Sequence, residues 1–397
     1  MNQYKKITGL LLTGVLTIGI AAGCSSTSTT TEVKKGETVK IGGLFDITGG
    51  TGDVGAPYAE GEKAYVEYIN AKGGVNGHKI KLIGDDYAYK IPEAQKLYQK
   101  LKSNDKVSAI LGWGTGDTEA LRQQVAADKL PFFSASYSEH LKDMKQSPYN
   151  FLTAASYSDQ ARTVLKWIKD NHKGGTPKVA LIYNDTAFGK SPIEDAKNFA
   201  KKIGVEIVDE QVVDLKALDA TSQLLNMNKK NPDYAIINQT WGATSTILKD
   251  AKKLGLKTQF IGLNWATGEG LVKIAGDASE GFIGVVTHAF PYEKDLEGMK
   301  EIEAYLKSKG ETLESKNQKF IQGWVTAKIL AEGIKNADKM TGEGIKEGLE
   351  EIKDLDLGGL AANVTFSKDS HAGTDKVRLA KVENGKFQVF TDYIGYK

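Results

Sequence analysis

ILGWGTGDTEALRQQVAADKLPFFSASYS, residues 110–138, is the stretch from which the fold can be worked out. It begins with an apolar run, continues through a glycine-rich loop and a segment of helical composition, and ends with a second apolar run and a second polar loop. This order is typical of two parallel strands joined by a helix. We expect loops at residues 112–117 and 134–138, a helix at 118–128 and a strand at 130–133.

Both polar loops are expected at one edge of the sheet. They leave the carboxyl ends of neighbouring parallel strands, which is where open α/β sheets bind ligands. Glycines let the backbone approach a ligand closely, and the N–H groups that open a helix suit an anion. Three hydroxyl side chains, those of Thr115, Ser136 and Ser138, lie in these loops. The stretch therefore predicts a pocket that holds a carboxylate without doing chemistry on it.

Length and composition describe a globular protein with room for two domains. The chain has 397 residues, of which 40% are hydrophobic and 26% are charged, values that allow sizeable cores. The formal net charge is +2. Charge this close to balance gives no support to a nucleic-acid partner or a polyanionic substrate.

The first residues have the organisation of a secretory signal. Lys5 and Lys6 precede an apolar run from Ile7 to Ile20, and three small residues then lead to Cys24. The run is too short to be a stable spanning helix. Cys24 is the single cysteine, so it cannot form an internal disulfide. Its position resembles the lipobox of bacterial lipoproteins, in which this cysteine is acylated; ordinary signal cleavage beside an incidental cysteine is the alternative.

The strand–loop–helix order recurs along most of the chain. A glycine-rich loop at residues 46–55 precedes a helix expected from Pro57 to Ile69, and a second series of elements starts with a helix at residues 158–171. Further strands are expected at residues 39–45, 80–85, 107–111, 178–183, 205–213, 234–238, 259–262 and 282–286. This pattern predicts an α/β chain with two Rossmann-like parallel-sheet lobes.

The tail departs from the pattern. Helices are expected at residues 293–308, 318–336 and 345–352, and ENGK at residues 383–386 is a hairpin signal between two short strands. We expect this helical block and the hairpin to complete the two earlier lobes and not to form a third domain.

At this point three strings resemble a known family. They are YINAKGGVNG at residues 68–77, LGLKTQFIG at 254–262 and IAGDASEG at 274–281. In this order they are similar to the type I periplasmic binding proteins of the leucine/isoleucine/valine-binding class, the solute-binding components of ABC importers. The resemblance covers residues 39 to about 395. It implies the type I periplasmic-binding fold, in which two lobes are joined by three crossovers and clamp a ligand between them.

The resemblance also implies the domain organisation. The crossovers are expected near residues 155–156, 287–288 and 361–363. The expected parts are a lipoprotein signal peptide (1–23), a flexible tether (24–38), lobe one (39–155 plus 288–362) and lobe two (156–287 plus 363–397).

In this family the loops quoted first grip the ligand's carboxylate. The resemblance places that role on Thr115, Gly116, Ser136 and Ser138. Strand-to-helix turns and helix caps are the alternative role for the same residues. Backbone N–H and hydroxyl donors can satisfy a buried carboxylate, in agreement with the role implied.

The ammonium side departs from the family. The positions that align with acids of relatives are Tyr157 and Asn264, and neither is an acid. A buried ammonium without a carboxylate is costly. Asp117, Asp185 and Glu269 are candidate replacements. Either one of them substitutes, or the ligand is not a standard α-amino acid.

Aromatic residues at the predicted loop mouths are candidates to wall an apolar or aromatic ligand and to meet an ammonium group. Packing between the lobes is the alternative role for each of them. Phe188 falls where relatives have a ligand-facing tyrosine, and Trp241 lies next to another such position. Val54 falls where relatives place an aromatic ring, which predicts extra room. The loop-mouth aromatics are Trp113, Tyr137, Tyr157, Phe188, Trp241 and Trp265.

Enzyme signals are weak. GWGTGD at residues 112–117 is not GxGxxG, and GKS at 189–191 lacks the first glycine of a P-loop, because that position is Asn184. The five histidines show no helical pairing that would indicate a metal site. We therefore expect no catalytic residue, no metal and no cofactor.

The expected function is that of an extracytoplasmic, lipid-anchored solute-binding component of an ABC importer. Its expected ligand is a small carboxylate, a branched-chain or other apolar or aromatic amino acid, captured by hinge closure. The expected partners are that ligand, an ABC permease and the membrane, and the chain is expected to be a monomer. The alternatives are a binding module for a sensor or signalling partner, a binder of a non-amino-acid carboxylate, and an anchored enzyme on the same scaffold.

Overall fold

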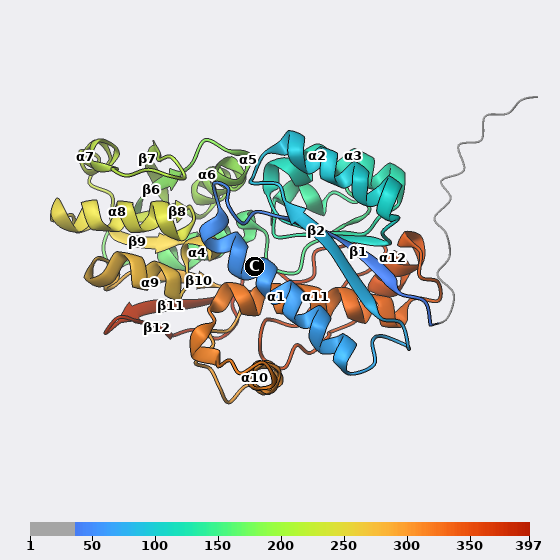
Figure 1. Ribbon diagram of the computed structural model, residues 1–397. Coiled ribbons are helices and arrows are strands. Elements are labelled where there is room, and N and C mark those ends of the chain that lie inside the picture. Colours follow the sequence, from blue (N-terminus) through green and yellow to red (C-terminus); the bar gives the residue numbers. More distant parts are fainter. Residues whose placement is uncertain (1–35) are drawn as a thin grey trace, which may run out of the picture.

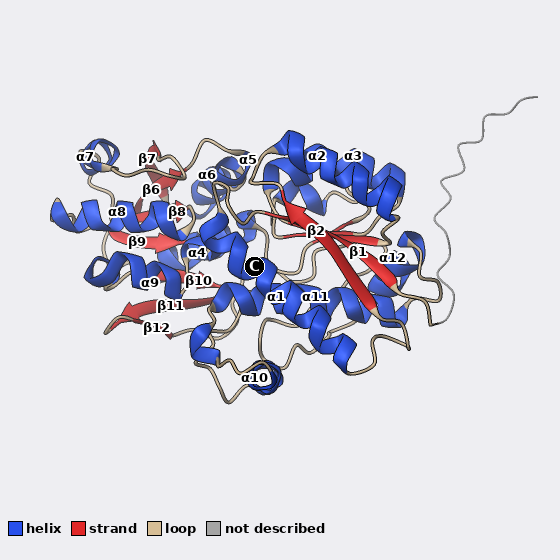
Figure 2. Cartoon of the chain, in the orientation of Figure 1, coloured by secondary structure: helices blue, strands red, loops and turns tan. Residues whose placement is uncertain are grey.

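The structure is a computed structural model, and it describes residues 36–397. The signal, Cys24 and most of the expected tether lie outside the described residues. Two separate sheets organise the rest of the chain (Figures 1 and 2).

The first sheet is parallel throughout. Its strands, in spatial order, are β2 (Ile80–Asp86), β1 (Val39–Phe45), β3 (Ala109–Gly112), β4 (Phe132–Ser134) and β5 (Asn150–Phe151). β3 is buried along its whole length because helices cover both faces of the sheet. Ile110 belongs to the core cluster shared with α2 and α3, and Leu111 to the cluster shared with α1 and α11. The three α-helices between these strands are α1 (Gly52–Ala71), α2 (Ile91–Lys100) and α3 (Thr115–Asp128).

The second sheet repeats the plan and adds a hairpin. Its strands, in spatial order, are β12 (Lys386–Val389), β11 (Arg378–Glu383), β10 (Ile283–Val286), β9 (Gln259–Gly262), β8 (Tyr234–Asn238), β6 (Lys178–Tyr183) and β7 (Glu206–Val212). β6 to β10 pair in parallel, whereas β11 and β12 pair antiparallel. Its helices are α4 (Tyr157–Asn171), α5 (Ala187–Lys190), α6 (Ile193–Ile203), α7 (Thr221–Asn228), α8 (Trp241–Lys253) and α9 (Glu269–Ala275).

The tail is divided between the two sheets. Helices α10 (Glu297–Ser308), α11 (Gln318–Asn336) and α12 (Gly342–Glu350) share a core cluster with the first sheet, and the β11–β12 hairpin is at the edge of the second. The chain therefore passes between the sheets three times. Two of the passages lie together, because His288 bridges Ala361 and the Ala289 N–H donates to the Leu360 carbonyl at 2.7 Å.

The expected fold class, two parallel-sheet α/β lobes joined by three crossovers, is confirmed. The exact lobe boundaries stay a prediction. Four expected helix starts differ from the structure by three residues or more. α10 begins at Glu297 and not at Glu293, and α12 begins at Gly342 and not at Ile345.

The other two helix starts bear on the site. α1 begins at Gly52 and not at Pro57, which lies inside the helix, and α3 begins at Thr115 and not at Thr118. In both helices, glycines that are typical of loops occupy the first turn. Thr115 and Gly116 therefore belong to the N-terminal end of α3 and not to the loop before it.

Helices α1 and α11 touch through their backbones. A Cβ on Gly61 would lie 2.0 Å from the Phe320 carbonyl oxygen, and one on Gly323 would lie 1.9 Å from the Tyr58 carbonyl oxygen. Real Cβ atoms do not approach a carbonyl this closely, so both positions require glycine for this approach. The contact fixes α11 against the first sheet, and with it the N-terminal end of α11, which faces the second lobe.

Gly323→Ala is expected to destabilise the fold by about 1–3 kcal/mol, because the added methyl group has no space and the helices must separate. In an exposed helix interior the same change is normally favourable by about 0.5–1 kcal/mol. The measurement is urea unfolding. Gly175→Ala is the matched control, because nothing lies within 4 Å of the position that its methyl group would take. Equal stability of the two variants would show that the helices do not pack in this way.

Candidate functional site

A small cavity of about 20 Å³ lies between the carboxyl ends of the two sheets. Its walls come from the segments that follow β1, β2, β3, β6, β8 and β9 and from the first residue of α4, so both lobes contribute. This is the position at which parallel α/β sheets bind ligands. Its volume of about 20 Å³ is far below the range of about 300–1,000 Å³ that is usual for ligand pockets, so the lobes must separate to admit a ligand. The lining residues are Thr51, Val54, Tyr89, Trp113, Gly114, Thr115, Tyr157, Phe188, Thr240 and Trp265.

The first glycine-rich loop brings a helix end to the cavity. Gly114 is extended (φ −78°, ψ 161°) and α3 starts at the next residue. The N–H groups of Thr115 and Gly116 therefore open a helix and lack intrahelical partners. Thr115 lines the cavity, whereas a Cβ on Gly116 would meet the Ile91 side chain at 3.0 Å. Positive helix-end charge and a hydroxyl thus coincide at Thr115.

The two serines of the second loop have different surroundings. The Ser136 hydroxyl donates to Thr115 Oγ1 at 2.9 Å, so it supports the threonine from behind. The Ser138 hydroxyl donates to Glu119 Oε1 at 2.6 Å, and Ser138 is not among the lining residues. Of the four residues expected at the carboxylate, the structure places Thr115 on the cavity wall, Ser136 behind it, and Gly116 and Ser138 outside the lining.

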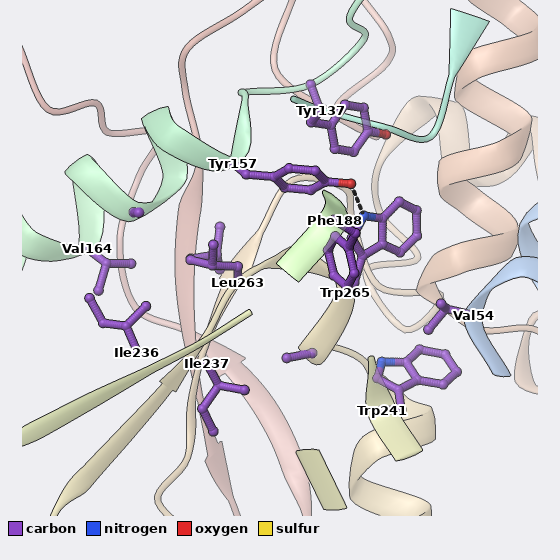
Figure 3. Packing of buried hydrophobic residues seen from close by; sticks show 14 of the residues in the cluster. Val54, Tyr137, Tyr157, Val164, Phe188, Ile236, Ile237, Trp241, Leu263 and Trp265 are labelled. Carbon is purple, nitrogen blue, oxygen red and sulfur yellow. Dashed lines mark hydrogen bonds between the residues drawn. The ribbon is translucent and has the colours of Figure 1, made fainter. Parts of the chain in front are cut away.

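Aromatic rings form most of the wall. The Tyr157 and Phe188 rings lie 5.4 Å apart and those of Trp113 and Trp265 lie 4.9 Å apart, both pairs edge to face. The Trp265 indole N–H donates to the Tyr157 hydroxyl at 2.9 Å (Figure 3). Such rings offer a large apolar contact surface.

Trp265 reaches from the second lobe into the first. Its ring is parallel to that of Tyr137, with an interplanar angle of 2° and centroids 6.0 Å apart, and it meets the Tyr58 ring at the same distance. Trp241 instead donates its indole N–H to the Thr267 carbonyl at 2.9 Å and is not among the lining residues. Trp241 therefore lies beside the loop that carries Trp265 and not on the cavity wall.

Asn264 is buried beside Trp265. Its backbone N–H donates to Gln160 Oε1 at 3.0 Å, and its carbonyl accepts from Lys319 Nζ at 2.7 Å. Both polar atoms of its side chain lack a hydrogen-bond partner within residues 36–397. Buried amides are seldom left unpaired, so Asn264 stays a candidate ligand contact although it is outside the cavity lining.

The three acids considered as replacements lie elsewhere. Asp117 accepts a hydrogen bond from the Tyr87 hydroxyl at 2.8 Å, and burial raises the pKa of Asp117 to about 7. Glu269 accepts from the Gln318 N–H at 3.0 Å. Asp185 is exposed and pairs with Lys190. Within residues 36–397, the cavity lining contains no charged side chain.

Sequence reasoning missed Thr51, Tyr89 and Thr240. Thr240 lies two residues after the end of β8, so the strand-end rule that selected Thr115 would also have selected it. Thr51 is the residue before α1, and it was hidden by the late helix start expected at Pro57. Tyr89 gave no signal, because its position after β2 depends on the backbone turn at Ala88 and Tyr89, both with positive φ.

The described part of the chain gives no sign of other site types. Residues 36–397 contain no group of three or more histidine, cysteine, aspartate or glutamate residues that could hold a metal ion. In the same residues no helix has the length and apolar content to cross a membrane.

Fold and cavity together define a two-lobed binding protein that holds a small ligand between its lobes. The family model described as periplasmic binding protein matches residues 38–386, so the chain belongs to this family. A Leu/Ile/Val-binding protein homologue from Brucella melitensis is 26% identical over 86% of this chain and 88% of its own length.

Two solved structures are similar over most of both chains. An ABC transporter substrate-binding protein from Aeropyrum pernix is 31% identical, with a TM-score of 0.84 over 90% of this chain and 95% of its own. A branched-chain amino acid ABC transporter protein from Thermus thermophilus, solved with bound valine, is 27% identical, with a TM-score of 0.85 over 92% and 97%. The expected type I periplasmic-binding fold is therefore confirmed.

A completely buried lysine joins the lobes behind Trp265. Lys319, in the first turn of α11, donates to the Asn264 carbonyl at 2.7 Å and to Gln318 Oε1 at 2.9 Å. Its Nζ lies 5.1 Å from the Trp265 ring centroid. Burial lowers the pKa of Lys319 to about 7, although nearby Glu269 opposes this shift. Lys319 thus holds the backbone of the Trp265 loop, while Tyr157 holds the Trp265 indole.

Lys319→Met is expected to change how stability depends on pH. The pKa of Lys319 is about 7 in the folded chain and 10.5 ordinarily, so the unfolded chain binds this proton more tightly. The penalty for burying the charge is complete below about pH 7 and disappears as the pH rises toward 10.5. The native chain should therefore gain stability relative to the variant over this range, measured by urea unfolding at a series of pH values. A constant difference between the two proteins would contradict the lowered pKa.

Proposed function

We propose that this chain is the extracytoplasmic solute-binding component of an ABC importer, and that it captures a small apolar or aromatic α-amino acid, such as a branched-chain one, by hinge closure. The observation that carries the proposal is the cavity, because its wall is completed only when segments of both lobes meet. Thr115 and Trp113 come from the first lobe, and Phe188, Thr240 and Trp265 from the second.

The ligand's carboxylate is proposed to bind at Thr115. The start of α3 provides N–H groups and a favourable dipole there, and Ser136 donates to the Thr115 oxygen. Because Ser136 supplies that hydrogen, the Thr115 hydroxyl can donate its own. It now hydrogen-bonds to the Tyr157 side chain, and the carboxylate is proposed to take the place of that partner. The aromatic wall then encloses the side chain. This arrangement binds a carboxylate without placing a nucleophile and a base beside it, which supports binding and not turnover.

Hinge closure is supported by contacts that must form and break between the lobes. Asp53 Oδ2 in α1 accepts from the Gly242 N–H in α8 at 2.9 Å, and Lys319 in α11 donates to the Asn264 carbonyl of the second lobe at 2.7 Å. In the proposed cycle a ligand stabilises this closed arrangement, and a permease recognises it. The names of the relatives support the substrate-binding part of this role, since they describe Leu/Ile/Val-binding and ABC-transporter proteins.

The lipid anchor belongs to the proposal too. Cys24 follows an apolar run and small residues, a position that suits acylation at the outer face of a bacterial membrane. A short polar segment then connects it to β1.

A thermal-shift panel of amino acids and related carboxylates tests the function. Ligands that bind the folded chain should raise its melting temperature in proportion to RT ln(1 + [L]/Kd). We expect apolar or aromatic amino acids to give the largest shifts, and no ligand to be converted to a product. If no amino acid or related carboxylate shifts melting at millimolar concentration, the proposal is wrong.

Thr115→Val tests the carboxylate position by calorimetric titration. Loss of a hydrogen bond to a charged group costs about 1.5–3 kcal/mol, so affinity should fall by about 10- to 100-fold. Thr115→Ser keeps the hydroxyl and should retain most of the affinity. Ser138→Ala is a matched control in the neighbouring loop, because its hydroxyl is bonded to Glu119. A Ser138→Ala defect as large as that of Thr115→Val would mean that the carboxylate is held elsewhere.

Cys24→Ser tests the anchor. Serine cannot form the thioether to a lipid, so the variant expressed in a bacterium should move from the membrane fraction to the soluble extracytoplasmic fraction. The measurement is fractionation with mass determination of the mature N-terminus. A variant that remains in the membrane to the same extent as the native chain would exclude Cys24 as the anchor.

A further inference from the structure

The cavity has no charged side chain on its wall within residues 36–397, yet two of its hydroxyls are bonded to carboxylates directly behind them. These carboxylates make part of the wall a hydrogen-bond acceptor. That property determines which end of a polar ligand this part of the wall can bind. An inference about that property rests on the proposed function, because it concerns the same site.

Thr51 is the first of these hydroxyls. Its backbone N–H and its hydroxyl both donate to Oδ2 of Asp46, at 2.9 and 2.6 Å. Asp46 is fully buried and also accepts from the Gly49 N–H at 2.7 Å. With its hydrogen committed to Asp46, the Thr51 oxygen can only accept. It takes the Trp113 indole N–H at 2.8 Å, and one further lone pair remains.

Thr240 repeats the arrangement from the other lobe. It immediately precedes α8, and its side chain hydrogen-bonds to the carboxylate of Asp53 in the first turn of α1. The same carboxylate accepts the Gly242 N–H at 2.9 Å. Asp53 therefore fixes the direction of the Thr240 hydrogen, and the Thr240 oxygen on the cavity wall is an acceptor. A donor bonded to a carboxylate becomes a stronger acceptor in turn.

Thr115 has the opposite character. It accepts from Ser136, hydrogen-bonds to the Tyr157 side chain and stands at the start of a helix, so it is a donor with positive helix-end charge. The cavity thus has a donor side, at Thr115, and an acceptor side, at Thr51 and Thr240. A zwitterion has the matching polarity, whereas a simple carboxylate uses the donor side alone.

We propose that Thr51 and Thr240 receive the ammonium group of the ligand, each with a buried carboxylate behind it, so that the site selects an α-amino acid over the 2-oxo acid with the same side chain. Asp46 and Asp53 are the positioning residues of this subsite. They act through the threonines and do not line the cavity.

One nearby cation opposes this assignment. Lys319 Nζ lies 5.1 Å from the Trp265 ring centroid, but it is directed to the Asn264 carbonyl and Gln318 and does not line the cavity. Asp46 and Asp53 are each one hydrogen bond from the wall, through Thr51 and Thr240. The carboxylates are therefore coupled to the subsite by direct contacts. The lysine acts on it only indirectly, through its electrostatic interaction with Asp53.

The test is calorimetric titration of the full chain with L-leucine against 4-methyl-2-oxopentanoate, and with L-phenylalanine against phenylpyruvate. We expect at least one amino acid to bind about tenfold or more tightly than its 2-oxo acid. Thr240→Val should remove most of that preference, with a loss of affinity for the amino acid and little change for the 2-oxo acid. Thr240→Ser keeps the hydroxyl and should keep the preference.

Asp53→Asn is the second variant, because its amide oxygen can still accept from Gly242 while the negative charge is removed. It should reduce the preference for the amino acid, and melting curves establish that each variant is folded. Equal or tighter binding of the 2-oxo acid by the native chain, or an equal loss of both ligands in Thr240→Val, overturns this inference and leaves the proposed function standing. Absence of binding by amino acids and 2-oxo acids alike overturns both.

Discussion

The contact of Trp265 with the aromatic residues of the first lobe is the interaction on which the site depends. Trp265 follows β9 of the second sheet, yet its ring is parallel to Tyr137 and edge-on to Trp113. A single core cluster of buried residues consequently extends from α2 and α3 through these rings into the second sheet. Two α/β lobes with separate sheets are thus joined by apolar contact as well as by covalent crossovers.

The Trp265 loop is held from two sides. The Tyr157 hydroxyl accepts the indole N–H, and Lys319 binds the carbonyl of the preceding residue, Asn264. Lys319 is placed by the start of α11, and α11 is placed by its backbone contact with α1 through Gly61 and Gly323. A packing detail far from the cavity therefore determines where the cavity wall lies. The tail helices therefore influence the position of the cavity wall, although they contribute no lining residue in the described chain.

Much of the fold could be predicted from the sequence, because it depends on local pattern. Apolar runs ending in polar loops identify parallel strands, and β1, β6, β8 and β9 have the expected bounds. Thr115 was found by the rule that ligands bind after strand ends. The helix starts were missed because Gly52 and Gly116 are residues typical of loops. Local patterns give no indication of which partner a side chain will choose.

The partners of the site residues are set by the tertiary structure. Ser136 and Ser138 are two residues apart in one loop, but the first bonds to Thr115 and the second to Glu119. Trp241 and Trp265 both follow strands of the second sheet, and only Trp265 lines the cavity among the described residues. Sequence spacing cannot tell the two members of each pair apart, because their hydrogen-bond and packing partners lie on other helices and strands. For the same reason, the sequence could not show that Asp117, Asp185 and Glu269 lie away from the cavity lining.

A carboxylate behind a hydroxyl acts on the cavity differently from a carboxylate on the wall. Burial raises the pKa of Asp117 to about 7, and it also raises the pKa of Asp53 behind Thr240. Asp46 accepts from the Gly49 N–H, the Thr51 N–H and the Thr51 hydroxyl, so its oxygens are occupied by donors within the first lobe. Its influence reaches the cavity through a neutral oxygen, which costs less to leave without a ligand than a bare charge does. A wall without charged side chains and a preference for a charged ligand are therefore compatible.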